Sequence, residues 1–456
     1  MERRKKFVHA WKRRWTLLTM FCTLGLGFLG FAMVWTYWSN YQRFPPDQAD
    51  RDALAWPLPE QPSVVVLPIV SVTQTDEDEL LATQFGQDLI AILARVPGLF
   101  VIAPETSGRY LDGQFHIKDT AEALGVQYLV SGTMSHVREK YRIFLKVIDA
   151  FSGEVEWVED YDVDRAGLVS VIGQDFEEVL DALGVSKDLE ALSLPALASV
   201  STEAWIAYRE AVDYRIPGDR GSMEDSMARL EIASEADANW AAVPVEIAWT
   251  YLNAAKRGWP DLPSAAGKGN VRAGMAHALH AMKLDPGNPF AAARMADLLE
   301  TEGKMADALE IREKAAMLGP NSFSIQWALS QSLANAGRHD EALRVMRYAL
   351  RLHPRHNIGL VQELAERELK VDDFDAAYKS IDLVLARRPA SVEPMLLRIY
   401  VNGLEERWQE AKINVGHFLE LHQGFRFSEW SARQLARGRP GREKWSSILE
   451  KAGIPN

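Results

Sequence analysis

The chain has 456 residues, enough for two or three domains, and its 47% hydrophobic and 25% charged residues exclude a largely disordered protein. Its formal net charge is −12, but residues 1–15 carry seven basic side chains and one acid, a contribution of +6. The rest of the chain therefore has a net charge of −18. This charge argues against binding of nucleic acid there, because neutralising phosphates requires Lys and Arg. The single cysteine, Cys22, excludes an intramolecular disulfide.

An uncharged apolar segment follows the basic start of the chain, at residues 15–38. A helix of this length spans about 36 Å, enough to cross a hydrocarbon core of about 30 Å. Aromatic residues flank it, with Trp11 and Trp15 at one end and Trp35 and Trp38 at the other, as is typical of membrane interfaces. Because basic residues precede the segment and acids follow it, we expect a cytoplasmic N-terminus with the rest of the chain outside.

Other interpretations of the apolar segment fit less well. A cleaved signal peptide would have a shorter apolar core ending in small residues, whereas this one ends in aromatic residues. A lipoprotein site would place small residues before Cys22, where large ones stand. Gly25, Gly27 and Gly30 match the G-x-G-x-x-G pattern, but no strand precedes them, and they lack the four-residue spacing of a helix-dimerisation motif. An uncleaved anchor is therefore predicted.

A proline-rich stretch and then an α/β pattern come next. The five prolines within 39–62 predict an extended spacer rather than a packed element. Beyond it, β-branched and apolar runs predict strands and amphipathic runs predict helices. The expected elements are a strand at 62–70, a helix at 77–95, a strand at 99–103, a helix at 118–124, three hairpin-connected strands between 126 and 163, and a helix at 167–183. This order predicts a small α/β domain.

Several runs of this chain resemble a known family. SVVVLPIV at 63–70, LGVQYLVSGTM at 124–134 and LKVIDAFSGEVEWVEDYD at 145–162 resemble the TolB amino-terminal-type domain of bacterial membrane proteins. In those relatives the domain often lies outside the cytoplasmic membrane, between one membrane helix and a tetratricopeptide (TPR) array. The runs at 418–438 and 445–456 resemble the tail of relatives linked to a class III adenylate cyclase.

This resemblance implies a single-pass protein of a bacterial inner membrane, with a cytoplasmic N-terminus and a periplasmic bulk. Some relatives carry a cyclase domain on the cytoplasmic side and others a winged-helix DNA-binding domain. Only about 14 residues precede the predicted membrane helix in this chain. Neither domain fits into that length, so neither activity is expected here.

A 34-residue period marks the C-terminal half. Gly303 and Gly337 are 34 residues apart, as are Ala308 and Ala342, and prolines recur at the same interval. Glycine between two helices, alanine where the helices approach, and proline at the end of the unit are typical of TPR repeats. Looser units precede and follow these copies, which gives about six repeats. The proline series is Pro286, Pro320, Pro354 and Pro389, and the alanine series continues with Ala377 and Ala411.

These patterns define the predicted organisation, a multidomain chain with one transmembrane helix, a small TolB-like α/β domain and an all-α TPR solenoid. Its parts are a cytoplasmic basic tail (1–14), a transmembrane helix (15–38), a proline-rich linker (39–62), the α/β domain (63–185), the TPR repeats (200–424) and C-terminal capping helices (425–456).

No motif for catalysis or for a bound metal or cofactor is complete. GKGN at 267–270 lacks the first glycine and the final Ser or Thr of a phosphate loop. The pairs His277/His280 and His353/His356 lack the glutamate of a zinc protease, so surface histidines are expected. Three acids from Asp160 to Asp164 lack the glycine and glutamate of a calcium loop, and one solvated strand face is expected. We expect no enzyme, no cofactor and no metal.

The predicted binding site is the concave face of the repeats, which the first helix of each pair lines in TPR arrays. Trp327 is either a binding anchor there or a residue that packs between repeats. The acids suggest a partner segment with basic residues. The function expected is a scaffold or assembly factor for protein partners, and the alternative is a sensory component related to cyclase-type receptors. The candidate residues are Asp297, Glu300, Trp327, Gln331, Asn335, Gln362, Glu366 and Lys370.

Overall fold

The structure, a computed structural model, describes residues 47–73, 75–110, 115–171, 176–185, 200–215, 218–262, 269–436 and 445–456. The predicted basic tail and membrane helix, 1–38, lie outside these ranges. Within them, no helix combines the length and the apolar character needed to cross a membrane.

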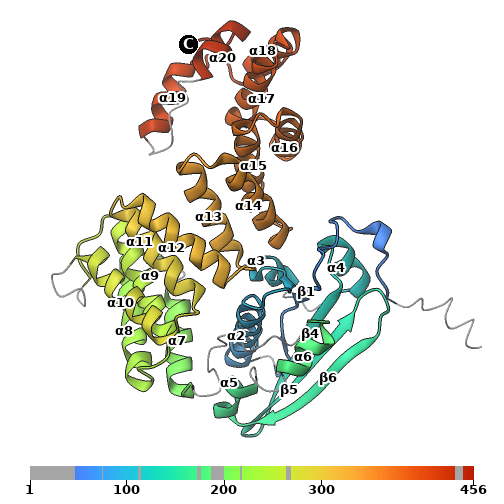
Figure 1. The fold of residues 1–456 in the computed structure, drawn as a ribbon, viewed down its shortest axis with the longest axis vertical. Helices are drawn as coiled ribbons and strands as arrows, with labels where there is room; N and C mark the ends of the chain where they lie inside the picture. The colour runs from blue at the N-terminus through green and yellow to red at the C-terminus, as the bar shows by residue number, and fades with distance from the viewer. Residues whose placement is uncertain are drawn as a thin grey trace, which may run out of the picture.

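An α/β domain opens the described chain (Figure 1). Its strands lie in the order β3-β1-β4-β5-β6, and β2 also pairs with β4. The strands are β1 (Ser63–Val66), β2 (Val70–Ser71), β3 (Phe100–Val101), β4 (Tyr128–Val137), β5 (Lys140–Asp149) and β6 (Val155–Val163). The helices are α2 (Asp76–Leu93), α3 (Pro104–Ser107), α4 (Ile117–Leu124), α5 (Leu168–Val171) and α6 (Phe176–Ala182).

Local chemistry explains where these elements begin and end. The Thr75 hydroxyl accepts a hydrogen bond from the Asp78 amide, and four acids fill the first turn of α2, where the helix dipole favours negative charge. Helix α4 ends at Gly125, whose φ of 63° is left-handed. The predicted strand 62–70 is split into β1 and β2 around Pro68, which has no amide hydrogen to donate to a ladder.

The sheet is parallel on one side and antiparallel on the other. Strand β1 pairs in parallel with β3 and β4, whereas β4, β5 and β6 form an antiparallel meander. Helices α2, α5 and α6 pack on one face, around Phe85, Ile143 and Phe176. Helix α4 covers part of the other face, around Leu124 and Phe100. Helix α4 therefore leaves part of this face of the antiparallel meander uncovered.

The spacer prediction does not hold for the described part of the linker. Asp47 accepts hydrogen bonds from the amides of Ile117 and Lys118 at 2.7 and 3.0 Å. The amide of Ala49 donates to the Ala150 carbonyl at 2.8 Å. The stretch is extended, as its prolines require, but these main-chain hydrogen bonds fasten it to the α/β domain.

Six helical hairpins follow in the described residues, and two shorter helices come after them. The hairpins are α7 (Thr202–Tyr214) with α8 (Arg220–Ala236), α9 (Ala242–Lys256) with α10 (Asn270–Leu284), α11 (Pro289–Thr301) with α12 (Met305–Leu318), α13 (Phe323–Asn335) with α14 (His339–Leu352), α15 (Ile358–Lys370) with α16 (Phe374–Arg387), and α17 (Val392–Leu404) with α18 (Trp408–Leu421). The last two helices are α19 (Phe427–Ala436) and α20 (Ser446–Ala452).

The repeated residues do what their spacing predicts. The alanines of the period, from Ala308 to Ala411, have no exposed surface, so paired helices approach closely. Gly303 and Gly337 both have φ of 78° in the turn between helices. In the last two repeats Asp372 and Glu406 make the same turn at φ of 58°, so glycine is not obligatory there. The chain is thus a TPR-like all-α solenoid joined to a small α/β domain.

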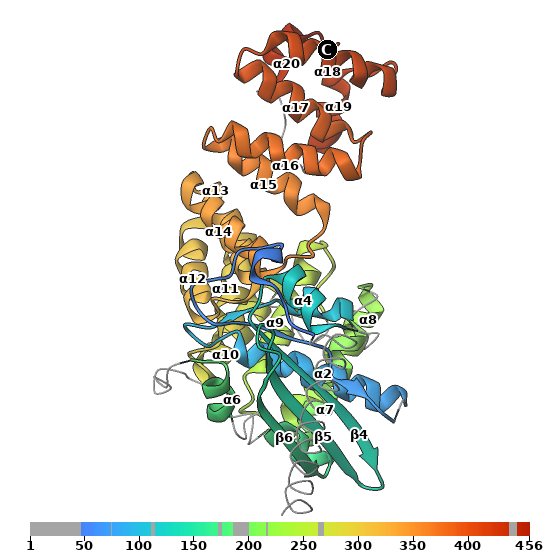
Figure 2. The same ribbon diagram turned by 90° about the vertical axis from the view of Figure 1, so that its right-hand side faces the viewer.

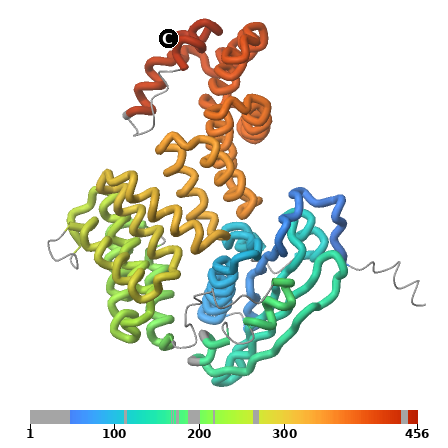
Figure 3. The backbone as a smooth tube through the Cα atoms, viewed as in Figure 1, coloured from blue at the N-terminus to red at the C-terminus, as the bar shows by residue number. Residues whose placement is uncertain are grey.

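The array follows a curved path around one side of the α/β domain (Figures 1 and 3). Helices α7 to α12 lie beside α2, and α15 to α20 extend away from the domain towards the C-terminus (Figure 2). Helix α20 packs on the last hairpin, where Leu449 and Ala452 join Leu396 and Phe418 in one core. This end of the solenoid is therefore capped by its own chain.

Candidate functional site

The predicted concave-face residues centre on a hydrogen-bonded group between the fourth and fifth hairpins. Trp327 Nε1 donates to Glu363 Oε2 at 3.0 Å, and Gln331 Nε2 donates to the same oxygen at 2.7 Å. The Trp327 ring packs against the buried cluster of Met346, Leu350 and Leu360. Trp327 therefore contributes to packing between repeats while one edge of its ring belongs to a polar group. Glu363, which joins the two predicted residues, was not predicted.

Similar bonds connect other pairs of neighbouring hairpins. Gln362 Nε2 donates to Glu393 Oε2 at 2.8 Å, from the fifth hairpin to the sixth. Glu300 accepts from the Ser332 hydroxyl at 2.6 Å, from the third to the fourth. These bonds and the Glu363 pair form a series of polar contacts between successive first helices. We call this series the first-helix polar ladder.

Asp297 and Glu300 also bind a buried cation. Arg312, only 1% exposed, lies 3.1 Å from the Asp297 carboxylate and 2.8 Å from that of Glu300. Asp297 also pairs with Arg294 at 2.9 Å. These acids are therefore already neutralised within the array, which removes the basis for expecting a basic partner there.

The remaining predicted residues lie on two of the helices that carry the ladder, α13 and α15. Asn335 and Lys370 are exposed, one at the end of α13 and the other at the end of α15. Glu366 is half-buried on α15. The structure thus brings the eight predicted residues onto three successive first helices, and the exposed polar groups among them gather at the ends of these helices.

The array also docks on the α/β domain, through an interface that was not predicted. Asn321 lies in the loop that closes the third hairpin and is 2% exposed. Its Nδ2 donates to the Leu99 carbonyl at 2.7 Å, and its Oδ1 accepts from the Val101 amide at 3.3 Å. The Ala103 amide donates to the Leu352 carbonyl at 2.8 Å. The array therefore satisfies the outer edge of β3, with which no strand pairs among the described residues.

The end of the fourth hairpin supplies a second set of docking contacts. Arg351 donates to the carbonyls of Leu124 and Gly125 at 2.9 and 2.7 Å, next to the end of α4 where carbonyls lack helical partners. Burial lowers the pKa of Arg351 to about 10. His353 Nδ1 lies 2.6 Å from the Thr106 hydroxyl, and burial lowers the pKa of His353 to about 4. His353 is 7% exposed, so the expectation of a surface histidine is wrong here.

Helix α2 contacts the earlier hairpins. The Asp88 carboxylate accepts from Trp205 Nε1 at 3.0 Å and pairs with Arg209, both on α7. Arg95, just after α2, pairs with Asp285 at 3.3 Å and donates to the Gly287 carbonyl at 2.9 Å. Successive repeat-closing loops carry Gly287, Asn321 and Arg355. Gly287 and Asn321 form hydrogen bonds with the α/β domain, and Arg355 lies over the Tyr110 ring. These loops recur with the TPR period, which is the one sequence signal that could have suggested an interface.

The other motifs have structural roles. Asn270 of the GKGN run begins α10, and its side chain accepts from the Leu262 amide and donates to the Trp259 carbonyl. Asp160 and Asp162 lie exposed on β6, as expected, beside Arg142 of β5. Asp164 lies beyond the end of β6 and accepts a hydrogen bond from the Gly167 amide at 2.8 Å, so it is not part of this strand face. Across the described part of the chain, no group of three His, Cys, Asp or Glu side chains is arranged to hold a metal ion.

Fold and contacts define the class as a TPR-like solenoid docked on an α/β domain. No protein-family model matches the chain. It is 31% identical over 154 residues to "Putative adenylate cyclase 3" of Rhizobium meliloti (strain 1021), a match that covers 33% of this chain and 26% of that protein. The chain therefore matches about a quarter of that relative's length.

Several solved structures are similar to part of the chain. Pseudomonas aeruginosa pilF is 16% identical, with a TM-score of 0.38, and covers 49% of this chain and 93% of its own. A tetratricopeptide repeat protein from Parabacteroides merdae is 11% identical, with a TM-score of 0.35, and covers 55% and 99%. MamA from Desulfovibrio magneticus RS-1 is 17% identical, with a TM-score of 0.31, and covers 43% and 100%.

Proposed function

We propose that this protein is a non-enzymatic, membrane-anchored scaffold or assembly factor that binds a protein partner on the first-helix side of its repeats. The first-helix polar ladder is the observation that carries the proposal. Its groups are held in place by bonds between hairpins, so a partner meets a surface that is already ordered, and less ordering entropy is lost on binding. Exposed Asn335 and Lys370 at its edge are available for contact.

The docking interface supports the same role. Contacts from α7, from the loops that close the second and third hairpins and from the end of α14 hold four successive hairpins against the α/β domain. Because the domain holds this part of the array, the later hairpins project from a fixed base (Figure 2). Such an arrangement suits a protein that presents a binding surface at a set distance from an anchor.

Partner binding is tested by replacing the aromatic residue of the ladder. Trp327→Ala removes the donor to Glu363 and the ring that packs beside it, so a partner cross-linked in intact cells should be lost or reduced at least tenfold. Met317→Ala is the matched control, because Met317 is 75% exposed on α12, a second helix. Equal recovery of the same cross-linked partner with both variants would contradict the proposal.

The anchor and the periplasmic location belong to the proposal as well. They are supported by the uncharged segment at 15–38, its aromatic flanks and the basic residues before it. An arginine in the middle of such a segment costs about 2.5–3.5 kcal/mol of insertion energy. Leu26→Arg should therefore move the chain out of the carbonate-resistant membrane fraction, whereas Leu26→Val should leave it there. Digestion of the repeats by protease in spheroplasts tests the periplasmic side.

A second candidate is a sensory or regulatory component of a cyclase-type signalling system. It is supported by the 31% identity with the Rhizobium meliloti protein and by the resemblance of residues 63–162 to TolB-type domains of receptor proteins. This candidate predicts that expressing the full-length chain changes cyclic AMP in the host cell. Unchanged cyclic AMP, together with partner loss in Trp327→Ala, would favour the scaffold.

A further inference from the structure

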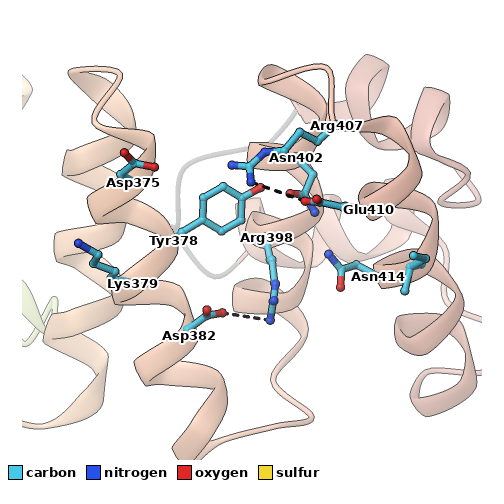
Figure 4. Close-up of a pocket in the computed structure, with 10 residues that line it drawn as sticks. Asp375, Tyr378, Lys379, Asp382, Arg398, Asn402, Arg407, Glu410 and Asn414 are labelled. Atoms are coloured by element: carbon cyan, nitrogen blue, oxygen red, sulfur yellow. Dashed lines mark ion pairs between the residues drawn. The ribbon is translucent and has the colours of Figure 1, made fainter.

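A cleft lies between the last two hairpins, away from the first-helix polar ladder. It has a volume of about 600 Å³, with α16 and α18 as its walls and α17 between them (Figure 4). Since second helices form the walls, the cleft opens on the opposite side of the array from the ladder. Its lining residues are Asp375, Tyr378, Lys379, Asp382, Arg398, Asn402, Arg407, Glu410, Ile413 and Asn414.

The two preceding hairpin junctions are bridged by an ion pair at the equivalent place. Glu313 pairs with Arg338 at 2.5 Å, and one repeat later Arg347 pairs with Asp373 at 2.9 Å. The 34- and 35-residue offsets between these repeats make Asp382 and Arg407 the corresponding residues of the last junction.

These two residues have other partners. Asp382 pairs with Arg398 of α17 at 3.0 Å. Arg407 forms ion pairs with Glu405 and, at 3.6 Å, with Glu410. Its guanidinium group lies over the Tyr378 ring. The bridge is therefore replaced by separate contacts on each side, and the cleft stays open between them (Figure 4).

Three residues that line this opening carry buried polar atoms without hydrogen-bond partners among the described residues. Asn402 is 1% exposed, and within the described residues its Oδ1 has no hydrogen-bond donor. Its equivalent one repeat earlier, Glu368, accepts from the Ser380 hydroxyl at 2.7 Å and pairs with Arg347 at 3.1 Å. A buried acceptor without a donor is costly, so Asn402 lacks a partner that the earlier repeat supplies from its own chain.

Two further groups repeat the pattern. The Tyr378 hydroxyl and Arg398 Nε are buried and lack hydrogen-bond partners in the described part of the chain. Their equivalents one repeat earlier are Leu343 and Leu364, which need none. The last junction thus differs from the others by carrying donors and acceptors where leucines could pack.

The cleft continues into a smaller pocket of about 140 Å³, with which it shares Arg398 and Asn414. Leu385, Pro389 and Met395 give this pocket an apolar lining. On α16, Leu385 lies ten residues after Asp375, a distance of about 15 Å at 1.5 Å per residue. That length accommodates about four or five residues of extended chain.

We propose that this cleft binds an extended peptide segment of a partner protein. Main-chain amides suit the unpartnered groups, because a peptide N–H can donate to Asn402 Oδ1 and a peptide carbonyl can accept from Arg398 Nε or the Tyr378 hydroxyl. An aliphatic side chain fits the Leu385 pocket. The lining carries three acids and three bases, so no net charge favours a polyanion such as nucleic acid. This inference deepens the proposed function by giving the scaffold a second binding site.

The test is selection of a random heptapeptide phage library on the purified full-length chain, followed by fluorescence anisotropy with the enriched synthetic peptides. We expect enriched peptides to share an aliphatic position and to bind Asn402→Leu at least tenfold more weakly than wild type. Leucine occupies the equivalent position two repeats earlier, as buried Leu333, so this variant should fold with an unchanged or raised thermal midpoint. Tyr378→Leu, which restores the residue of the earlier repeat, should also weaken binding.

Trp327→Ala separates this proposal from the proposed function. It should leave peptide affinity unchanged, because Trp327 lies on the ladder and not in this cleft. Equal affinity of the enriched peptides for wild type and Asn402→Leu would overturn the cleft as their site. Failure of any peptide to be enriched over the parent phage would overturn it as well. Neither result depends on whether Trp327→Ala loses its cross-linked partner.

Discussion

Replacing Asn321 by alanine should loosen the array from the α/β domain. The Asn321 amide joins the Leu99 carbonyl at 2.7 Å and the Val101 amide at 3.3 Å, at a position that is 2% exposed. Alanine removes both bonds and leaves a buried acceptor and a buried donor without partners, at about 1–3 kcal/mol for each. The hydroxyl of Tyr348, 3.2 Å from Asn321 Oδ1, loses its acceptor as well. We therefore expect a loss of about 2–6 kcal/mol.

Urea-induced unfolding and amide hydrogen exchange would measure this effect. The unfolding free energy should fall by the stated amount, and the Val101 amide should exchange faster because its acceptor is gone. Asn335→Ala is the control, since Asn335 is exposed at the end of α13 and should change stability by less than about 0.5 kcal/mol. If Asn321→Ala unfolds like this control and Val101 stays protected, the array does not hold the edge of β3 in solution.

Three further predictions concern the array. Burial, followed by the charges of His356 and Arg109, lowers the pKa of His353 to about 4. Below pH 6.5 His353 is therefore protonated in the unfolded chain but stays neutral in the folded chain until about pH 4. Stability should thus be full above pH 6.5 and fall by up to about 3 kcal/mol towards pH 4, and unfolding titrations of His353→Gln should lack this component. Gly337→Ala should cost about 1–2 kcal/mol in the same assay, because φ is 78° while no atom lies within 4 Å of the added carbon. Ala342→Leu, at a position with no exposed surface, should lower the unfolding free energy by about 1–3 kcal/mol through overpacking, and an unchanged value would contradict the close helix approach.

The repeat half of the fold could be read from the sequence because its signals are local. Glycine, alanine and proline at fixed spacing specify a turn, a close contact and a helix end within one hairpin. The same logic explains the α/β elements, where strand runs and the cap at Gly125 depend on near neighbours. The helix expected at 167–183 is helical in its described residues, as α5 (Leu168–Val171) and α6 (Phe176–Ala182).

The docking interface could not be predicted because it depends on residues that are far apart in the chain. Arg351 donates to the carbonyl of Leu124, 227 residues away. Every residue has a backbone carbonyl, so the sequence does not show which one accepts this hydrogen bond. The buried state of His353 follows from the same docking. For the candidate site, the repeat period placed the eight residues on first helices, and the structure has them on α11, α13 and α15. The period did not reveal that Asp297 and Glu300 are neutralised by Arg312, which lies on the next helix.

The partner of the β3 edge lies far downstream, which has a consequence for synthesis on the ribosome. The Val101 amide has no acceptor from Asn321 until that residue, 220 positions later in the chain, has been synthesised. At about 5–20 residues per second, that interval is about 10 to 45 seconds. Throughout it the nascent α/β domain has an open strand edge, the kind of surface on which chains aggregate. Slow synthesis or truncation within the repeats should therefore create a demand for chaperones that the completed protein does not have.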